Sequence, residues 1–241
     1  MSIKEEVLKQ VEAALVREVH FNRQTHRVEM EFSDGALTLQ GEVPDVACKK
    51  LTLEAAATVP GVRGIVDRLH VAPTERAGDG AVRDAACELL LRDVDFQNCT
   101  LRAWVKGRPE TLREAGEDSC GAVQVEVEDG VVTLTGQVIS LSHKRVAGVL
   151  AWWARGCRDV VNGLEVVPPE EDSDDEVTDA LRLVLETDPL VPADQIGIRT
   201  RNHVVTLEGV VTTEEEKKRA ELDAWYLFAV DRVINHIEVR P

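Results

Sequence analysis

Three stretches of the sequence alternate apolar and polar residues on both sides of a two-residue turn. They are residues 28–43 around Asp34-Gly35, residues 123–138 around Asp129-Gly130, and residues 196–211 around Asn202-His203. Strict alternation puts the apolar side chains on one face of a strand, and a tight hairpin turn needs residues that tolerate positive φ. The pattern therefore predicts three β-hairpins.

These hairpins belong to a longer repeat whose register runs without a gap. An offset of 95 places Gly41 on Gly136, and an offset of 73 places Gly136 on Gly209. The same offsets align three side chains able to cap a helix and three closing apolar stretches, which are Asp45, Ser140 and Thr213, then residues 65–71, 160–166 and 233–239. We interpret the chain as one unit copied three times, and the three glycines as structural positions of that repeat.

Each unit opens with apolar residues at helical spacing, and the first and third openings carry capping-box pairs, Ser2 with Glu5 and Ser173 with Glu176. Each unit is therefore predicted to be αββαβ. A right-handed crossover makes its three strands a small mixed sheet with both helices on one face. The fold class is α+β, with units at 1–72, 79–167 and 173–241.

The second unit carries an insertion, roughly residues 98–121, between its first helix and its hairpin. Within it Arg102, Lys106, Arg108 and Arg113 surround Trp104. Long loops inside compact domains are often functional, so one interpretation is a partner-contacting loop. The other is a short extra helix or hairpin that packs Trp104 and Leu101 onto a neighbouring unit.

The second helix of the middle unit, residues 146–154, is apolar all round, which is typical of a helix buried on both sides. Trp152 and Trp153 in this helix correspond to Trp225 and Tyr226 in the third unit. We expect these aromatic residues to mediate contact between repeats or subunits. The alternative is an exposed aromatic surface for a ligand or a lipid. Trp152, Trp225 and Tyr226 thus join Arg102, Trp104, Lys106 and Arg108 as candidate partner-binding residues.

The repeat resembles the BON domain, named for bacterial osmotically inducible and nodulation proteins. The match is carried by residues 129–136 and 203–209 of the hairpins and by residues 160–166. The resemblance implies the αββαβ fold and a non-enzymatic binding module linked to the bacterial envelope or osmotic stress. Such modules are proposed to contact phospholipids or proteins, and some relatives with a LysM domain sense potassium. This sequence shows no periplasmic signal peptide and nothing like LysM.

Charge narrows the possible partners. The chain has 44 acidic and 28 basic residues, a net charge of −16. This balance argues against nucleic acid as a partner and against unaided adsorption to anionic lipid. Residues 168–241 carry 18 of the acidic and 8 of the basic residues, net −10. Their acidic run, residues 170–176, is interpreted as a solvated linker that favours the start of the next helix, with a cation site as the alternative.

The remaining chemistry is sparse. Five cysteines without a C-x-x-C pair suggest neither a disulfide framework nor a zinc site, and favour buried, reduced thiols. The histidines, His20 and His26 among them, show no metal-ligand spacing. No P-loop or nucleophile elbow occurs, so we assign no catalytic residue, metal or cofactor. With no signal sequence and no membrane-spanning segment, a cytoplasmic location is predicted.

The leading hypothesis is a non-enzymatic binding or scaffold protein, stress- or envelope-associated, that holds another protein or itself. Triplication without reactive groups favours it. The alternatives are a sensor responsive to potassium or calcium, favoured by the acidic balance, and a peripheral phospholipid-binding protein.

Overall fold

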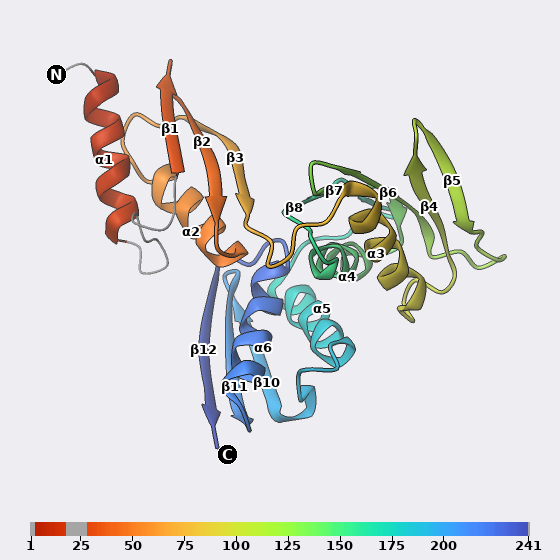
Figure 1. The fold of residues 1–241 in the computed structure, drawn as a ribbon. Helices are drawn as coiled ribbons and strands as arrows, with labels where there is room; N and C mark the ends of the chain where they lie inside the picture. The colour runs from red at the N-terminus through yellow and green to blue at the C-terminus, as the bar shows by residue number, and fades with distance from the viewer. Residues whose placement is uncertain (1–2, 18–27, 241) are drawn as a thin grey trace. The chain divides into compact units, whose positions relative to one another are not determined.

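The structure, a computed structural model, describes residues 3–17 and 28–240 and contains the same order of elements three times (Figure 1). The chain forms two compact units, Met1–Pro73 and Thr74–Pro241. The first holds one repeat and the second holds two. The prediction of three αββαβ repeats is therefore confirmed.

The first repeat is built as its pattern predicts. Its elements are α1 (Ile3–Arg17), β1 (Val28–Ser33), β2 (Ala36–Val43), α2 (Val46–Ala57) and β3 (Gly64–Val71). Strand β2 pairs antiparallel with β1 and parallel with β3, so α2 makes the crossover between the two parallel strands. Leu37 and Leu39 of β2 are fully buried against Val11 of α1 and Leu69 of β3 in one core. Ser2, half of the predicted first capping box, lies outside the described residues.

The third repeat has the same topology. Its elements are α5 (Asp174–Thr187), the short 3-10 turn η1 (Ala193–Gln195), β10 (Ile196–Arg201), β11 (Val204–Val211), α6 (Glu214–Tyr226) and β12 (Arg232–Val239). A capping side chain is present at both helices, although only the Ser173 half of the predicted Ser173–Glu176 capping box is observed. Ser173 accepts the backbone N–H of Glu176, and Thr213 forms a complete capping box with Glu216. Capping satisfies backbone donors that would otherwise be left unpaired where each helix begins.

The second repeat keeps the three-stranded unit and adds to it. The repeated part comprises α3 (Asp79–Arg92), β6 (Gly121–Glu128), β7 (Val131–Val138), α4 (Leu141–Trp153) and a closing strand split into β8 (Asp159–Asn162) and β9 (Glu165–Val166). The insertion forms a hairpin of β4 (Cys99–Val105) and β5 (Arg108–Arg113). Because β4 pairs parallel with β6, the sheet order is β5-β4-β6-β7-β8, with β9 also on β7. Figure 1 shows the hairpin at the outer end of this sheet.

Repeats 2 and 3 share a continuous apolar core. Helix α4 packs on its own sheet and on α3, and also against α5 and α6 of the next repeat. Its residues Val146, Val149 and Leu150 are almost completely buried. These contacts confirm the prediction that this helix is covered on both sides. The physical reason is that a helix without a polar face is normally buried around its whole circumference.

Two of the three repeat glycines show why no side chain is tolerated. Gly136 and Gly209 have φ values of +123° and +147°. A Cβ on Gly136 would lie 2.1 Å from the carbonyl oxygen of Ala122, and one on Gly209 would lie 2.0 Å from that of Gln195. Gly41 adopts the same conformation, with φ of +146°. The two strands of a hairpin can therefore approach each other this closely only where the second strand has glycine.

The expectation that the cysteines form no disulfide is wrong for one pair. Cys99 and Cys120 are disulfide-bonded, with their Cα atoms 4.9 Å apart. The parallel register of β4 and β6 sets Cys99 opposite Gly121, so the preceding residue, Cys120, is held beside it. Sequence spacing could not show this, because the two cysteines meet only after β4 has joined the sheet. The other three cysteines, Cys48, Cys87 and Cys157, are buried thiols outside the disulfide, as expected.

We expect the pair of substitutions Cys99→Ser and Cys120→Ser to lower the free energy of unfolding by about 3 kcal/mol, since the bond closes a loop in the unfolded chain. Chemical denaturation with and without reductant measures this: reductant should shift the wild-type midpoint and leave the double variant unchanged. Thiol labelling of the denatured, unreduced protein should modify three cysteines. Labelling of all five would contradict the assignment.

Candidate functional site

The inserted hairpin divides its side chains between the core and solvent. Leu101 and Ala103 of β4 are buried, so the alternate residues Arg102 and Trp104 lie on the face of the sheet away from the helices. Arg102 is exposed and Trp104 is half-buried. Lys106 and Arg108 flank the turn at the hairpin tip and are exposed. Arg102 and Trp104 thus share one face, whereas Arg108 pairs with Val105 and lies on the other face, 3.9 Å from Glu110. We call these four predicted residues, all outside the core, the hairpin surface.

Arg113 does not belong to the hairpin surface. Its guanidinium donates to the carbonyl oxygens of Cys99 at 3.2 Å, Leu91 at 3.1 Å and Phe96. These bonds fix the end of β5 to the loop that follows α3. Arg113 therefore holds the base of the hairpin, and the hairpin itself packs on the edge of its own sheet.

The other predicted residues lie on the helices, so the structure does not bring all seven together. Trp152 of α4 stacks on Tyr226 of α6, with ring centroids 5.5 Å apart and an interplanar angle of 14°. Trp225 is buried, with 3% of its surface exposed. Stacked aromatic pairs add stability beyond the area they bury. Trp152 and Tyr226 thus join repeats 2 and 3, which is the architectural interpretation of the aromatic residues.

A buried polar cluster lies at the same junction. Asp223 of α6 is fully buried and accepts a hydrogen bond from Trp153 Nε1 of α4 at 2.9 Å. Arg219 pairs with Asp188 at the end of α5 and lies 3.6 Å from Asp223. Burial raises the pKa of Asp223 to about 8, although Arg219 opposes that shift. The carboxyl group of Asp223 thus contacts one residue from each repeat, Trp153 of repeat 2 and Arg219 of repeat 3.

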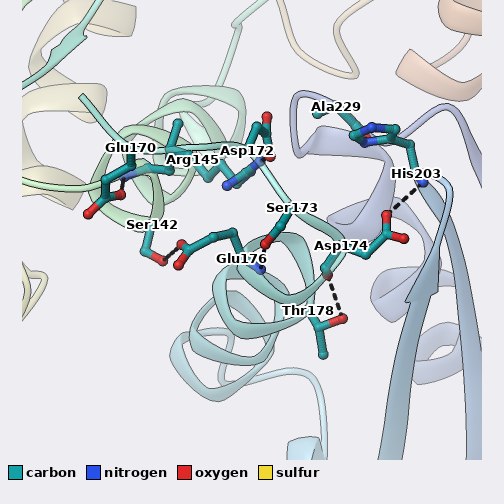
Figure 2. A network of polar contacts seen from close by, with 11 residues as sticks. Ser142, Arg145, Glu170, Asp172, Ser173, Asp174, Glu176, Thr178, His203 and Ala229 are labelled. Carbon is teal, nitrogen blue, oxygen red and sulfur yellow. Dashed lines mark hydrogen bonds and ion pairs between the residues drawn. The ribbon is translucent and has the colours of Figure 1, made fainter.

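The acidic linker is anchored at several points rather than freely solvated (Figure 2). Glu170 accepts the backbone N–H of Leu141 at 2.7 Å, and Asp172 pairs with Arg145, which is fully buried. Asp174 accepts the backbone N–H groups of the third hairpin turn, Asn202 at 2.7 Å and His203 at 2.9 Å. These two donors, with His203 the stronger, lower the pKa of Asp174. The run connects two repeats through specific contacts.

Repeat 3 contains an open pocket of about 560 Å³. One wall is the apolar turn at residues 189–192 after α5, and the other is the first two turns of α6. Glu215, Glu216 and Arg219 line the second wall. The pocket thus combines an apolar surface with two acidic side chains, one basic side chain and the hydroxyl-bearing Thr213.

The structure offers little for covalent or metal chemistry. In residues 3–17 and 28–240, no three His, Cys, Asp or Glu side chains are placed to hold a metal ion. His20 and His26 lie outside those ranges. Burial raises the pKa of the Cys48 and Cys87 thiols to about 11 and about 12, which keeps them protonated and unreactive at neutral pH. Over the same described ranges, no helix is long and apolar enough to cross a membrane.

The model of the BON domain matches three parts of the chain, residues 4–73, 110–168 and 173–241, one in each repeat. The second match leaves out α3 and β4 of repeat 2. The protein belongs to the BON domain family. The second match begins inside β5, so most of the β4–β5 hairpin lies outside the part that this BON repeat shares with the family.

One relative of this BON protein is osmotically-inducible protein Y of Escherichia coli (strain K12), 28% identical over 124 residues. That match covers 49% of the present chain and 62% of the relative, so it spans less than two thirds of the relative's length. Two solved structures of CdsD, a structural protein of the type III secretion system of Chlamydia trachomatis, are similar at 14% identity. Their TM-scores are 0.24 and 0.26. The first match, to the C-terminal domain, covers all of both chains, and the second covers 98% of this chain and 93% of the other.

Sequence reasoning missed the polar residues of the repeat 2–repeat 3 junction in this BON protein. Asp223 had a usable signal: at the same position the other copies carry the apolar residues Ala55 and Leu150. A carboxylate in place of an aliphatic side chain indicates a buried polar contact. Arg145 had no signal, because its counterparts are Lys50 and Lys218 and all three are basic.

Proposed function

We propose that this BON protein is a non-enzymatic binding protein that uses the hairpin surface to hold a protein partner or a second copy of itself. The observation that carries the proposal is the hairpin: it extends one repeat beyond the common unit and displays Arg102, Trp104, Lys106 and Arg108 away from the core. Positive charge beside a half-buried aromatic ring stands out in a chain of net charge −16. Trp and Arg are the residues most enriched among those that dominate binding energy at interfaces.

The family and the osmotically inducible relative support a role in stress. The cytoplasmic location stays a prediction, and the Cys99–Cys120 bond argues in the other direction because disulfides persist mainly in oxidising compartments. The acidic linker gives little support to a cation sensor, since several of its carboxylates already bind protein groups.

A second candidate function uses the same residues. Basic side chains beside a tryptophan suit the interface of an anionic membrane, so the hairpin surface also supports peripheral phospholipid binding. The large negative charge of the rest of the chain opposes close approach to such a membrane. For this reason a protein partner is the better candidate.

Replacing Arg102, Trp104, Lys106 and Arg108 together with serine is expected to abolish partner binding with the fold retained, because three of the four are exposed and Trp104 is only half-buried. The matched control replaces Arg199, Arg201 and Arg232, exposed basic residues of repeat 3, with serine. Crosslinking and affinity purification from a bacterial extract measure protein capture, sedimentation velocity measures self-association, and flotation measures binding to phosphatidylglycerol vesicles. Equal binding by the hairpin variant and the wild type would contradict the proposal.

A further inference from the structure

Two repeats differ at one equivalent position beside the second helix. The loops after α3 and α5 have the same geometry, since Asp93 accepts the N–H of Asp95 and Asp188 accepts that of Leu190, both at 2.9 Å. Phe96 follows in repeat 2, and Val191 occupies the corresponding position in repeat 3. The chain therefore contains two versions of one groove, between this loop and the start of the next helix.

In repeat 2 the groove is filled. Phe96 is 1% exposed and meets the ring of His143 edge-on, with centroids 5.7 Å apart. In repeat 3 the smaller Val191 and the acidic Glu216 take the places of Phe96 and His143, and the pocket of about 560 Å³ opens there. Pockets of about 300–1,000 Å³ hold small organic ligands, so an aromatic side chain from outside fits within this volume.

The charge of the pocket indicates which residues should flank an aromatic side chain that enters it. Glu215 and Glu216 line it together with Arg219, whose charge is offset by its pairing with Asp188. Residues 168–241 carry 18 acidic and 8 basic residues. An aromatic ring flanked by positive charges is complementary to it. The hairpin surface has this chemistry, with Trp104 beside Arg102 on β4 and Lys106 at the tip.

We infer that the repeat 3 pocket receives Trp104 from the hairpin surface of a second copy of this chain, which deepens the proposed function and rests on it. In its own chain the hairpin lies at the end of the repeat 2 sheet (Figure 1), whereas the pocket is lined by residues of repeat 3. The contact joins two different surfaces, so it is head-to-tail. A dimer formed in this way still offers one free pocket on one copy and one free hairpin on the other, so further copies can add. A contact centred on one side chain is weak, and assembly should grow with concentration.

The test uses the full chain in sedimentation velocity, from about 1 µM to about 1 mM. The wild type should show a concentration-dependent rise in mass that weakens with added salt. Trp104→Ala, which removes the ring, and Val191→Phe, which fills the pocket as Phe96 does in repeat 2, should each weaken association at least tenfold. Trp104→Phe should retain most of it, and Leu112→Ala, an exposed apolar change on the same hairpin, should leave it unchanged.

Mixing the two defective variants gives the sharpest result. The Trp104→Ala chain keeps its pocket, and the Val191→Phe chain keeps its hairpin. A mixture should therefore form one-to-one heterodimers that do not grow further, although each variant alone is monomeric. A symmetric contact between two hairpins or two pockets predicts no such rescue.

Because Val191→Phe changes a buried position, Glu215→Lys provides a second pocket variant at an exposed one. It should weaken association as well, with the fold of the wild type retained. If the wild type stays monomeric throughout, or if neither pocket variant changes association, the inference is wrong. If neither pocket variant changes association, the proposed function still stands provided that the fourfold hairpin variant loses association. If the wild type stays monomeric, the proposed function still stands provided that the fourfold hairpin variant loses capture of another protein or of vesicles.

Discussion

Replacing Gly209 with alanine is expected to lower the free energy of unfolding by about 4 kcal/mol, near the upper limit for single substitutions. Its φ of +147° is strained for any L side chain, and the new Cβ would meet the carbonyl oxygen of Gln195 at 2.0 Å. That atom belongs to the backbone, so relief would require the two strands of the hairpin to separate. Denaturant titration followed by circular dichroism measures the loss.

Gly197 supplies a matched control in the same hairpin. A Cβ there would lie 3.6 Å from the carbonyl oxygen of Glu208, which is ordinary contact. Gly197→Ala should therefore change the free energy of unfolding by no more than about 1 kcal/mol. Similar losses for both variants would show that the close approach of the strands at Gly209 is not what requires glycine.

The stability of the unit Thr74–Pro241 is expected to fall as the pH rises toward 8. The pKa of Asp223 is raised by burial from 3.8 to about 8, so between these values the folded chain holds a proton that the unfolded chain releases. Stability from this group is complete below pH 4 and is lost as the pH rises through the folded pKa, with a maximum slope of about 1.4 kcal/mol per pH unit. Denaturation at a series of pH values measures the slope.

Asp223→Asn isolates this contribution. The amide cannot ionise but can still accept the hydrogen bond from Trp153 Nε1, so the variant should retain the fold and lose most of the decline between pH 4 and pH 8. Asp179→Asn, at an exposed carboxylate of α5, should follow the wild-type profile. An unchanged slope in the Asp223 variant would falsify the assignment of the pH dependence to this group.

The candidate surfaces were only partly predictable. The sequence shows that basic residues surround Trp104 in the insertion, but it does not show which of them face solvent and which bind the protein. Arg102 faces solvent, whereas Arg113 binds three backbone carbonyls. Both are arginines in the same segment. The difference arises from the side of the sheet on which each lies and from the loop after α3, which no local pattern records.

The sequence alone determined the triplicated αββαβ unit. Alternation sets the two faces of each strand, Asp-Gly turns supply positive φ, and a capping residue marks where each second helix begins. All these signals act within a few residues, so they can be read along the chain. The three copies reinforce one another because each carries the signals in the same register.

Only the tertiary structure decided what joins the copies and what remains open. The pairing of β4 with β6 brought Cys99 to Cys120, and the packing of α4 against repeat 3 buried Asp223. The exchange of Phe96 for Val191 opened a pocket in one repeat where the other is filled. These features depend on contacts between segments far apart in the chain, whose energies are set by packing and desolvation rather than by local residue preference.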